Sequence, residues 1–138
     1  MASCQKALSV RSIPATFAAS SALVTGVCDA FAKKGYAFGG FDACTSSDVL
    51  TGSGLSSSAA FEVLIGTVIN CLFFDKKLSQ PEVAMAAQYA EREFFGKPCG
   101  LMDQMACSVG SFVQIDFKDP SVPVINKVAF DFASCNHA

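Results

Sequence analysis

The sequence is poor in charge. Of its 138 residues, 10 are Lys or Arg and 12 are Asp or Glu, so charged side chains make up 16% of the chain, whereas about 25% is usual for soluble proteins. The formal net charge of -2 excludes the basic surface that a nucleic-acid-binding protein needs. The apolar content of 51% excludes a disordered chain. So few charged side chains would leave much of the surface apolar, so we expect the chain to self-associate or to belong to a larger protein.

The sequence also lacks an apolar run long enough for a membrane span. Its most apolar stretch, residues 59–74, contains Glu62 and Asn70 and is shorter than the roughly 20 residues that a span needs. We therefore expect no membrane partner. A basic, serine-rich N-terminus hints at a signal or transit peptide, but Val24 and Phe31 continue a seven-residue apolar repeat, which favours an amphipathic helix there.

Metal-ligating residues at close spacing are absent. There is one histidine, His137, and none of the seven cysteines forms a C-x-x-C pair, which excludes the usual zinc patterns. An odd number of widely spaced cysteines is typical of reduced, mostly buried thiols, and this indicates a cytoplasmic protein. Cys99 lies in a predicted loop, but a nucleophilic cysteine needs a basic partner and the one histidine is far away in the sequence, so Cys99 is better interpreted as structural.

The apolar periodicity predicts a chain of mixed α and β elements. Helices are expected over residues 15–33, with Gly35 as the C-terminal cap, after a serine-rich loop that ends at residue 58, over 79–95 and over 102–107. Strands are expected over 36–49, 112–117 and 122–132. The helix after the serine-rich loop should turn one apolar stripe to the core: Phe61, Leu64, Ile65, Val68 and Leu72. Ser79 and Glu82, with Pro81 between them, predict a capping box for the next helix.

The strongest local feature is a loop of small residues at positions 52–58. Its members are Gly52, Ser53, Gly54, Leu55, Ser56, Ser57 and Ser58. Glycines let a backbone approach a ligand closely, and the free N–H groups of the helix that follows attract anions, phosphate above all. No lysine lies between Asp48 and Phe74, so the loop is not the common P-loop, and it also fails the dinucleotide fingerprint. The alternative is a serine-rich turn with Ser56 as an ordinary N-cap.

Two carboxylates stand out further along the chain. Glu91 lies four residues after Ala87 and three before Phe94, which places it on the apolar stripe of its helix. A carboxylate that faces the core needs a cation or strong donors; from position alone, an ion pair with Lys or Arg, or an edge that reaches water, is the simpler interpretation. Asp103 begins a short predicted helix, where it either caps the helix or accepts or aligns a hydroxyl proton in a cleft.

Together these segments resemble a known enzyme family. Residues 52–60 are similar to the ATP-phosphate loop of the GHMP kinases, and residues 90–96 with 99–104 resemble the galactokinase branch of that superfamily. The resemblance spans roughly residues 39–117. It implies an α+β fold, that of the GHMP kinase N-terminal domain with its similarity to domain 2 of ribosomal protein S5.

The resemblance also implies roles for matching residues. Residues 52–58 would wrap the phosphates of ATP, and Ser58 and Glu91 would hold Mg2+. Asp103 would contact the sugar and act on its C1 hydroxyl, as a base or as an orienting group. The implied reaction transfers the γ-phosphoryl group of ATP to galactose, a chemistry that depends mainly on positioning and charge stabilisation.

The sequence departs from that family in two ways. Leu50 stands where galactokinases usually carry proline. The family's sugar-binding signature and its C-terminal domain have no counterpart here, so we expect residues 1–138 to be an incomplete N-terminal domain that is inactive by itself. The alternatives are an N-acetylgalactosamine kinase, a galactokinase-like sensor of sugar and nucleotide, and a short protein that uses the fold only for association.

Overall fold

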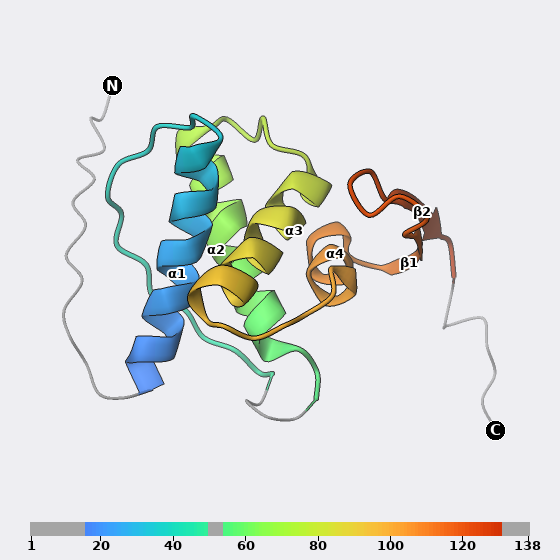
Figure 1. Ribbon diagram of the computed structural model, residues 1–138, viewed down its shortest axis with the longest axis horizontal. Coiled ribbons are helices and arrows are strands. Elements are labelled where there is room, and N and C mark those ends of the chain that lie inside the picture. Colours follow the sequence, from blue (N-terminus) through green and yellow to red (C-terminus); the bar gives the residue numbers. More distant parts are fainter. Residues whose placement is uncertain (1–15, 50–53, 131–138) are drawn as a thin grey trace.

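The structure is a layer of packed helices with a β-hairpin at one edge. The computed structural model describes residues 16–49 and 54–130. In chain order, its elements are α1 (Thr16–Lys33), α2 (Ser57–Phe73), α3 (Gln80–Tyr89), the π-helical turn η1 (Ala90–Phe94), α4 (Met102–Val109), β1 (Phe112–Asp116) and β2 (Val124–Val128). Figure 1 shows α1, α2 and α3 side by side, with α4 between them and the hairpin. No helix in this described part of the chain is long and apolar enough to cross a membrane.

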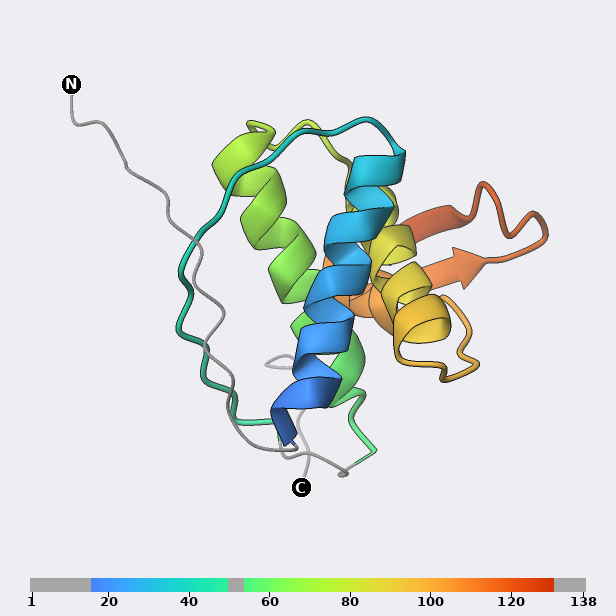
Figure 2. The same cartoon turned by 60° about the vertical axis from the view of Figure 1, so that its left-hand side comes forward.

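The main core lies between α1, α2 and α3. Val27 and Phe31 of α1, Ile69 of α2, and Val83 and Ala87 of α3 are at most 3% exposed and form one apolar cluster. Figure 2 shows α1 crossing in front of α2 and α3. This burial confirms the core-facing stripe expected for α3 at Ala87, whereas Phe94 at its end is 38% exposed. Gly35, with a φ of 82°, ends the last turn after α1 as expected.

Two glycines allow the helices to approach one another closely. A Cβ atom added to Gly26 of α1 would lie 2.6 Å from the Cα atom of Ala90, and one added to Gly66 of α2 would lie 2.9 Å from a methyl group of Val83. Gly26 therefore sets the contact between α1 and η1, and Gly66 sets the contact between α2 and α3.

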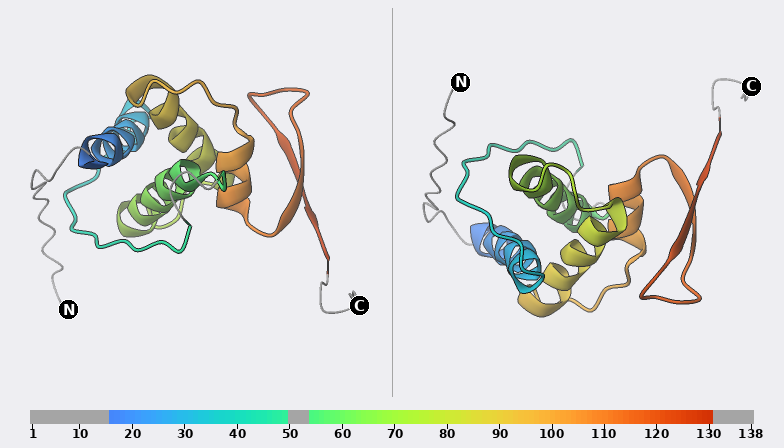
Figure 3. Two further views of the ribbon diagram at one scale, coloured as in Figure 1. Left: turned by 90° about the horizontal axis from the view of Figure 1, so that it is seen from below. Right: turned by 90° about the horizontal axis from the view of Figure 1, so that it is seen from above.

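The hairpin packs on a smaller apolar cluster around α4. β1 and β2 are antiparallel, with Phe112 opposite Val128. One side of the hairpin contacts Leu101 and Met105, and Figure 3 shows the hairpin projecting beyond α4. The expected strand at 112–117 is confirmed to within one residue, and the second strand occupies the middle of the expected 122–132. Several apolar residues of the hairpin and of the residues next to it remain exposed: Phe112, Val122, Val124, Val128 and Phe130.

The strand predicted for residues 36–49 is wrong. This segment has no regular secondary structure, and the only strands in the described part of the chain are β1 and β2. Its alternating aromatic residues instead pack on the end of α2: Phe38 and Phe41 contact the ring of Phe73, with centroids 6.3 Å apart in each pair. The alternation reflects contact with a helix, because no strand pairs with this segment.

The apolar stripe predicted for α2 is also partly wrong. Leu64 and Leu72 are more than 40% exposed, whereas Glu62 and Asn70 lie on the buried face with Ile65. Asn70 is buried because its side chain exchanges two hydrogen bonds with the backbone of Leu78, at 2.9 and 3.1 Å. The prediction failed because it considered apolar residues only, whereas two polar residues of this helix, Glu62 and Asn70, face inward.

The predicted capping box at the start of α3 is confirmed. The Ser79 hydroxyl accepts from the backbone N–H of Glu82, and the Glu82 carboxylate accepts from the backbone N–H of Ser79. The helix extends as far as expected, but its last turn, η1, is π-helical. Such a turn inserts one extra residue and is frequent at functional sites; here it contains Glu91.

The close approach at Gly26 predicts the effect of a single methyl group. Replacing Gly26 with Ala should destabilise the fold by about 1–3 kcal/mol through overpacking, even though Ala is the better helix former by about 1 kcal/mol. Urea denaturation measures the difference. Thr25→Ala, at an exposed neighbouring position of the same helix, is the matched control and should change stability little. A Gly26→Ala chain as stable as the unmodified one would show that α1 and η1 can separate at no cost.

Candidate functional site

The N-terminal end of α2 is formed by left-handed backbone. Gly54 has a φ of 78° and Ser56 a φ of 54°, and the intervening Leu55 is 70% exposed. Ser56 occupies the N-cap position, but its side chain makes no capping hydrogen bond, so its interpretation as an ordinary N-cap is wrong. The helix end therefore keeps the positive character that attracts anions. Gly52 and Ser53 of the predicted loop lie outside the described residues.

The Ser56 hydroxyl instead joins this end of α2 to α4. It donates a hydrogen bond of 2.5 Å to Oδ2 of Asp103, which lies exposed in the first turn of α4. The N-cap of α4 is Leu101, so Asp103 is not a capping residue either. The structure thus brings two of the sequence-predicted site residues together across 47 positions of the chain.

Ser58 and Glu91 also meet. The Ser58 hydroxyl donates to Oε1 of Glu91 at 2.8 Å, and the ammonium group of Lys97 lies 2.7 Å from the same oxygen. The Glu91 side chain is 2% exposed and that of Lys97 is 55% exposed. The inward direction expected for Glu91 is confirmed, and so is the simpler interpretation that an ion pair would accompany it.

A second layer of polar side chains lies behind Glu91, and sequence reasoning missed it. The other carboxylate oxygen, Oε2, accepts a 2.6 Å hydrogen bond from Nε2 of Gln104. The same nitrogen lies 3.5 Å from Oε2 of Glu62, and both Gln104 and Glu62 are at most 1% exposed. The available signal was a glutamate on the apolar stretch of α2, one helical turn after Ser58.

Burial and hydrogen bonding separate the two buried carboxyls. Burial alone would raise the pKa of Glu91, but hydrogen bonds from Lys97, Ser58 and Cys99 outweigh it and hold that pKa below its usual range. Burial, together with the smaller effect of the negative charge of Glu91, raises the pKa of Glu62 to about 8. Glu91 is thus a carboxylate at neutral pH, while Glu62 favours the protonated form.

The thiol of Cys99 is half-buried beside this cluster and is a free cysteine. Burial, followed by the charge and hydrogen bond of Glu91, raises its pKa to about 11. It is therefore a neutral thiol at physiological pH, which agrees with its interpretation as structural, because a nucleophilic cysteine must be a thiolate.

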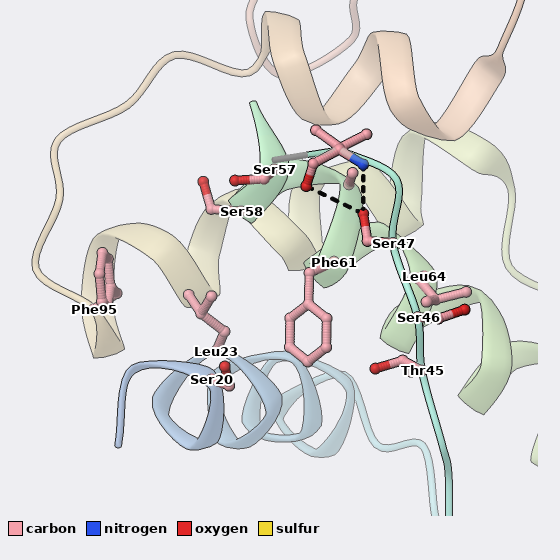
Figure 4. Close-up of a pocket in the computed structure, with 12 residues that line it drawn as sticks. Ser20, Leu23, Thr45, Ser46, Ser47, Ser57, Ser58, Phe61, Leu64 and Phe95 are labelled. Atoms are coloured by element: carbon pink, nitrogen blue, oxygen red, sulfur yellow. Dashed lines mark hydrogen bonds between the residues drawn. The ribbon is translucent and has the colours of Figure 1, made fainter. Parts of the chain in front are cut away.

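A pocket of about 430 Å³ opens beside the first turn of α2. Figure 4 shows Leu23 of α1 and Phe61 of α2 on its walls, with Ser57 and Ser58 at one end. The segment 45–49 closes the other side. Apolar walls with a few hydroxyl groups suit a flat, weakly polar group whose charged end lies at the helix terminus.

The arrangement offers a divalent cation only part of its coordination. Within residues 16–49 and 54–130, no three His, Cys, Asp or Glu side chains lie close enough to share a metal ion. The hydroxyl of Ser58 and the carboxylate of Glu91 are oxygen donors on one side of a helix N-terminus, which fits Mg2+ when phosphates and water supply its other ligands. Lys97 now provides a positive charge at that carboxylate.

The chain belongs to the GHMP kinases. Residues 22–111 match the family described as GHMP kinases N terminal domain, and this range contains every residue of the site described above. The suggested family is thereby confirmed.

Within this family, the matched residues are galactokinase-like. The chain is 46% identical over 85 residues to a protein of Clostridium tetani (strain Massachusetts / E88) named galactokinase, and 42% identical over 86 residues to a protein of Bacillus subtilis (strain 168) with the same name. Each match covers 62% of this chain and 22% of the relative. The aligned segment thus spans about a fifth of the length of these relatives.

The raised pKa of Glu62 predicts a pH-dependent stability. Between the ordinary pKa of 4.5 and the folded value of about 8, the folded chain holds a proton that the unfolded chain releases. The stabilisation is therefore complete below pH 4.5 and is lost as the pH rises towards 8. Glu62→Gln, which cannot titrate, should remove a fall on the order of 3 to 5 kcal/mol across this window.

Chemical denaturation at a series of pH values tests this prediction. The charged or titratable groups that interact with Glu62 are Glu91, Lys97 and the thiols of Cys99 and Cys107, and all remain in the variant. Glu93→Gln, an exposed carboxylate of the same turn as Glu91, is the control and should keep the slope. An unchanged slope in Glu62→Gln would show that Glu62 ionises normally.

Proposed function

We propose that this chain provides the ATP-phosphate and Mg2+ site of a sugar kinase, which transfers the γ-phosphoryl group of ATP to the C1 hydroxyl of galactose. The observation that carries the proposal is the meeting of Ser58 and Glu91 at 2.8 Å beside the uncapped N-terminus of α2. An anion-binding helix end and two oxygen ligands are what a metal-bound nucleotide requires.

The phosphates of ATP would lie against the start of α2. Residues 52–58 would surround them: Gly52, Ser53, Gly54, Leu55, Ser56, Ser57 and Ser58. The left-handed backbone at Gly54 and Ser56 supports this, because it turns the chain sharply just before the free N–H groups of the helix. The neighbouring apolar pocket is suited to the nucleoside.

Ser58 and Glu91 would hold Mg2+ between them and the phosphates. When bound, the ion would neutralise charge on the phosphoryl oxygens. Lys97 contacts the same oxygen of Glu91, so its ammonium group would have to share this carboxylate or move towards a phosphate oxygen. Its 55% exposure leaves the side chain room to do so.

Asp103 would act on the sugar. Its exposed carboxylate, now bonded to the Ser56 hydroxyl, would accept the proton of the C1 hydroxyl or orient that group. The hydroxyl oxygen forms a bond to the γ-phosphorus as the bond between that phosphorus and ADP breaks. The short link from Ser56 to Asp103 supports this role, since it ties the sugar-reactive group to the phosphate loop.

Residues 1–138 would form part of the ATP-binding domain, with the fold of ribosomal protein S5 domain 2. The sugar-binding segment and a C-terminal domain would come from elsewhere in the complete kinase, which agrees with the 22% share of its relatives that the chain matches. We place this kinase in the cytoplasm, where ATP is available. Assays of the native gene product would contradict the galactose assignment if they showed phosphorylation of N-acetylgalactosamine, or binding of sugar and nucleotide without turnover.

The metal assignment predicts that removing either ligand raises the Mg2+ requirement. Ser58→Ala and Glu91→Gln should each raise the Mg2+ concentration needed for tight ATP binding at least about 10-fold, because the first removes an oxygen ligand and the second removes the negative charge of the carboxylate ligand. Calorimetric titration with ATP at a series of Mg2+ concentrations measures this. Thr67→Ala, exposed on the same helix, is the control. Unchanged Mg2+ curves in both variants would contradict the assignment.

The role of Asp103 predicts a loss of turnover. In the native gene product, Asp103→Asn should reduce galactose phosphorylation at least about 100-fold, because the amide cannot accept the proton but keeps the size of the side chain. Coupled assay of ADP release gives the rate. Asp116→Asn, on β1 away from the site, serves as the control. A variant with nearly normal turnover would remove Asp103 from the mechanism.

A further inference from the structure

Glu62 is a buried carboxyl group for which the proposed reaction has no use. It lies on α2 one turn after Ser58 and is 0% exposed. Among residues 16–49 and 54–130 no cation lies within ion-pair distance of it, because the nearby Lys97 binds Glu91. An isolated buried carboxylate is strongly unfavourable. The position therefore demands an explanation in terms of what Glu62 contacts.

Its contact is the carboxamide of Gln104. Nε2 of Gln104 donates to Glu91 at 2.6 Å and lies 3.5 Å from Oε2 of Glu62. Two buried polar atoms nearby have no hydrogen-bond partner, and they belong to the same two residues: Oε1 of Glu62 and Oε1 of Gln104. A proton on the Glu62 carboxyl would make that group a donor, and a hydrogen bond from it to Oε1 of Gln104 would satisfy both atoms.

We propose that Glu62 is a positioning residue for Glu91: as a neutral carboxylic acid it pairs with the Gln104 carboxamide, and this pair directs the amide N–H at the Glu91 carboxylate. In the pair, the Glu62 hydroxyl donates to Oε1 of Gln104 while its carbonyl oxygen accepts one N–H. The second N–H of Gln104 is then left for Glu91. Every donor and acceptor of the buried amide thereby has a partner.

The electrostatics support the neutral form. Burial, with the smaller effect of the Glu91 charge, raises the pKa of Glu62 to about 8, and the titratable groups that interact with it (Glu91, Lys97, Cys99 and Cys107) include only one cation. An ionised Glu62 has no proton to donate, so in the pair its carboxylate and Oε1 of Gln104 would be two acceptors that repel each other. That repulsion would turn the amide and take its N–H away from Glu91.

The consequence for metal binding rests on the proposed function, whereas the pairing itself does not. Groups that orient a metal ligand from behind typically change metal affinity 10–100-fold when removed. Gln104 fixes one oxygen of Glu91, and this leaves the other, which Ser58 and Lys97 contact, facing the helix end.

Two variants separate pairing from packing. Glu62→Gln retains a donor and an acceptor for Gln104, whereas Glu62→Met fills the same space without either; Glu62→Leu serves if the Met variant does not fold. Proton NMR of the 138-residue chain follows solvent exchange of the Gln104 carboxamide, identified by its loss in Gln104→Leu. We expect protection in the unmodified chain and in Glu62→Gln, and loss of protection in Glu62→Met. Equal protection in all three would overturn the pairing.

Mg2+-dependent ATP binding then tests the effect on Glu91. Glu62→Met should weaken the apparent Mg2+ affinity about 10–100-fold, while Glu62→Gln should stay within about threefold and so rescue the loss. Val63→Ala is the control for a general loss of stability: it removes buried apolar volume on the same helix and should leave the Mg2+ affinity unchanged. If Glu62→Met binds Mg2+ normally, or Glu62→Gln is as impaired as Glu62→Met, the positioning role is overturned. If even the unmodified native gene product shows no Mg2+ dependence of ATP binding, the proposed function fails, and the exchange measurement alone decides the pairing.

Discussion

The site depends on one physical requirement: the Glu91 carboxylate, which is buried in a helical core, must be fully hydrogen-bonded. Glu91 is 2% exposed and receives donors from three separate segments: the first turn of α2, the loop after η1, and α4. Each donor fixes the position of the segment that carries it. The cost of leaving this charge unpaired, which is several kcal/mol for a buried ion, therefore couples the N-terminus of α2 to the turn of α3 and to α4. The anion-binding helix end and the proposed sugar-reactive Asp103 are held in one frame by that requirement.

The helices around this charge can meet because small residues lie where they cross. Gly26 lets α1 reach η1, and Gly66 lets α2 reach α3. The π-helical turn shifts the direction of the chain by one residue just where Glu91 must face inward. Close packing and an irregular turn thus have the same effect, which is to bring a charged group to the buried side of the helix layer.

Local chemistry made much of this predictable. The capping box at Ser79 and the inward direction of Glu91 follow from spacing alone, and both are present. The strand expected over residues 36–49 failed because alternation does not say whether a partner strand exists. The stripe of α2 failed because apolar pattern ignores polar residues with buried partners. Lys97 and Gln104 could not be found at all, since their meeting with Glu91 depends on the folded path of residues 94–104. The family resemblance pointed to the same loop and carboxylates, and the roles it implies for them stay predictions.

The short connection between α2 and α3 has a consequence for how the chain folds. Asn70 fastens the end of α2 to Leu78, and the two helices then run back along each other until Ser58 meets Glu91, only 33 positions later. Contacts this close in sequence need little loop closure, and such contacts form quickly. The Ser58–Glu91 contact therefore lies within one contiguous helical hairpin, which can order during synthesis before α4, β1 and β2 have left the ribosome.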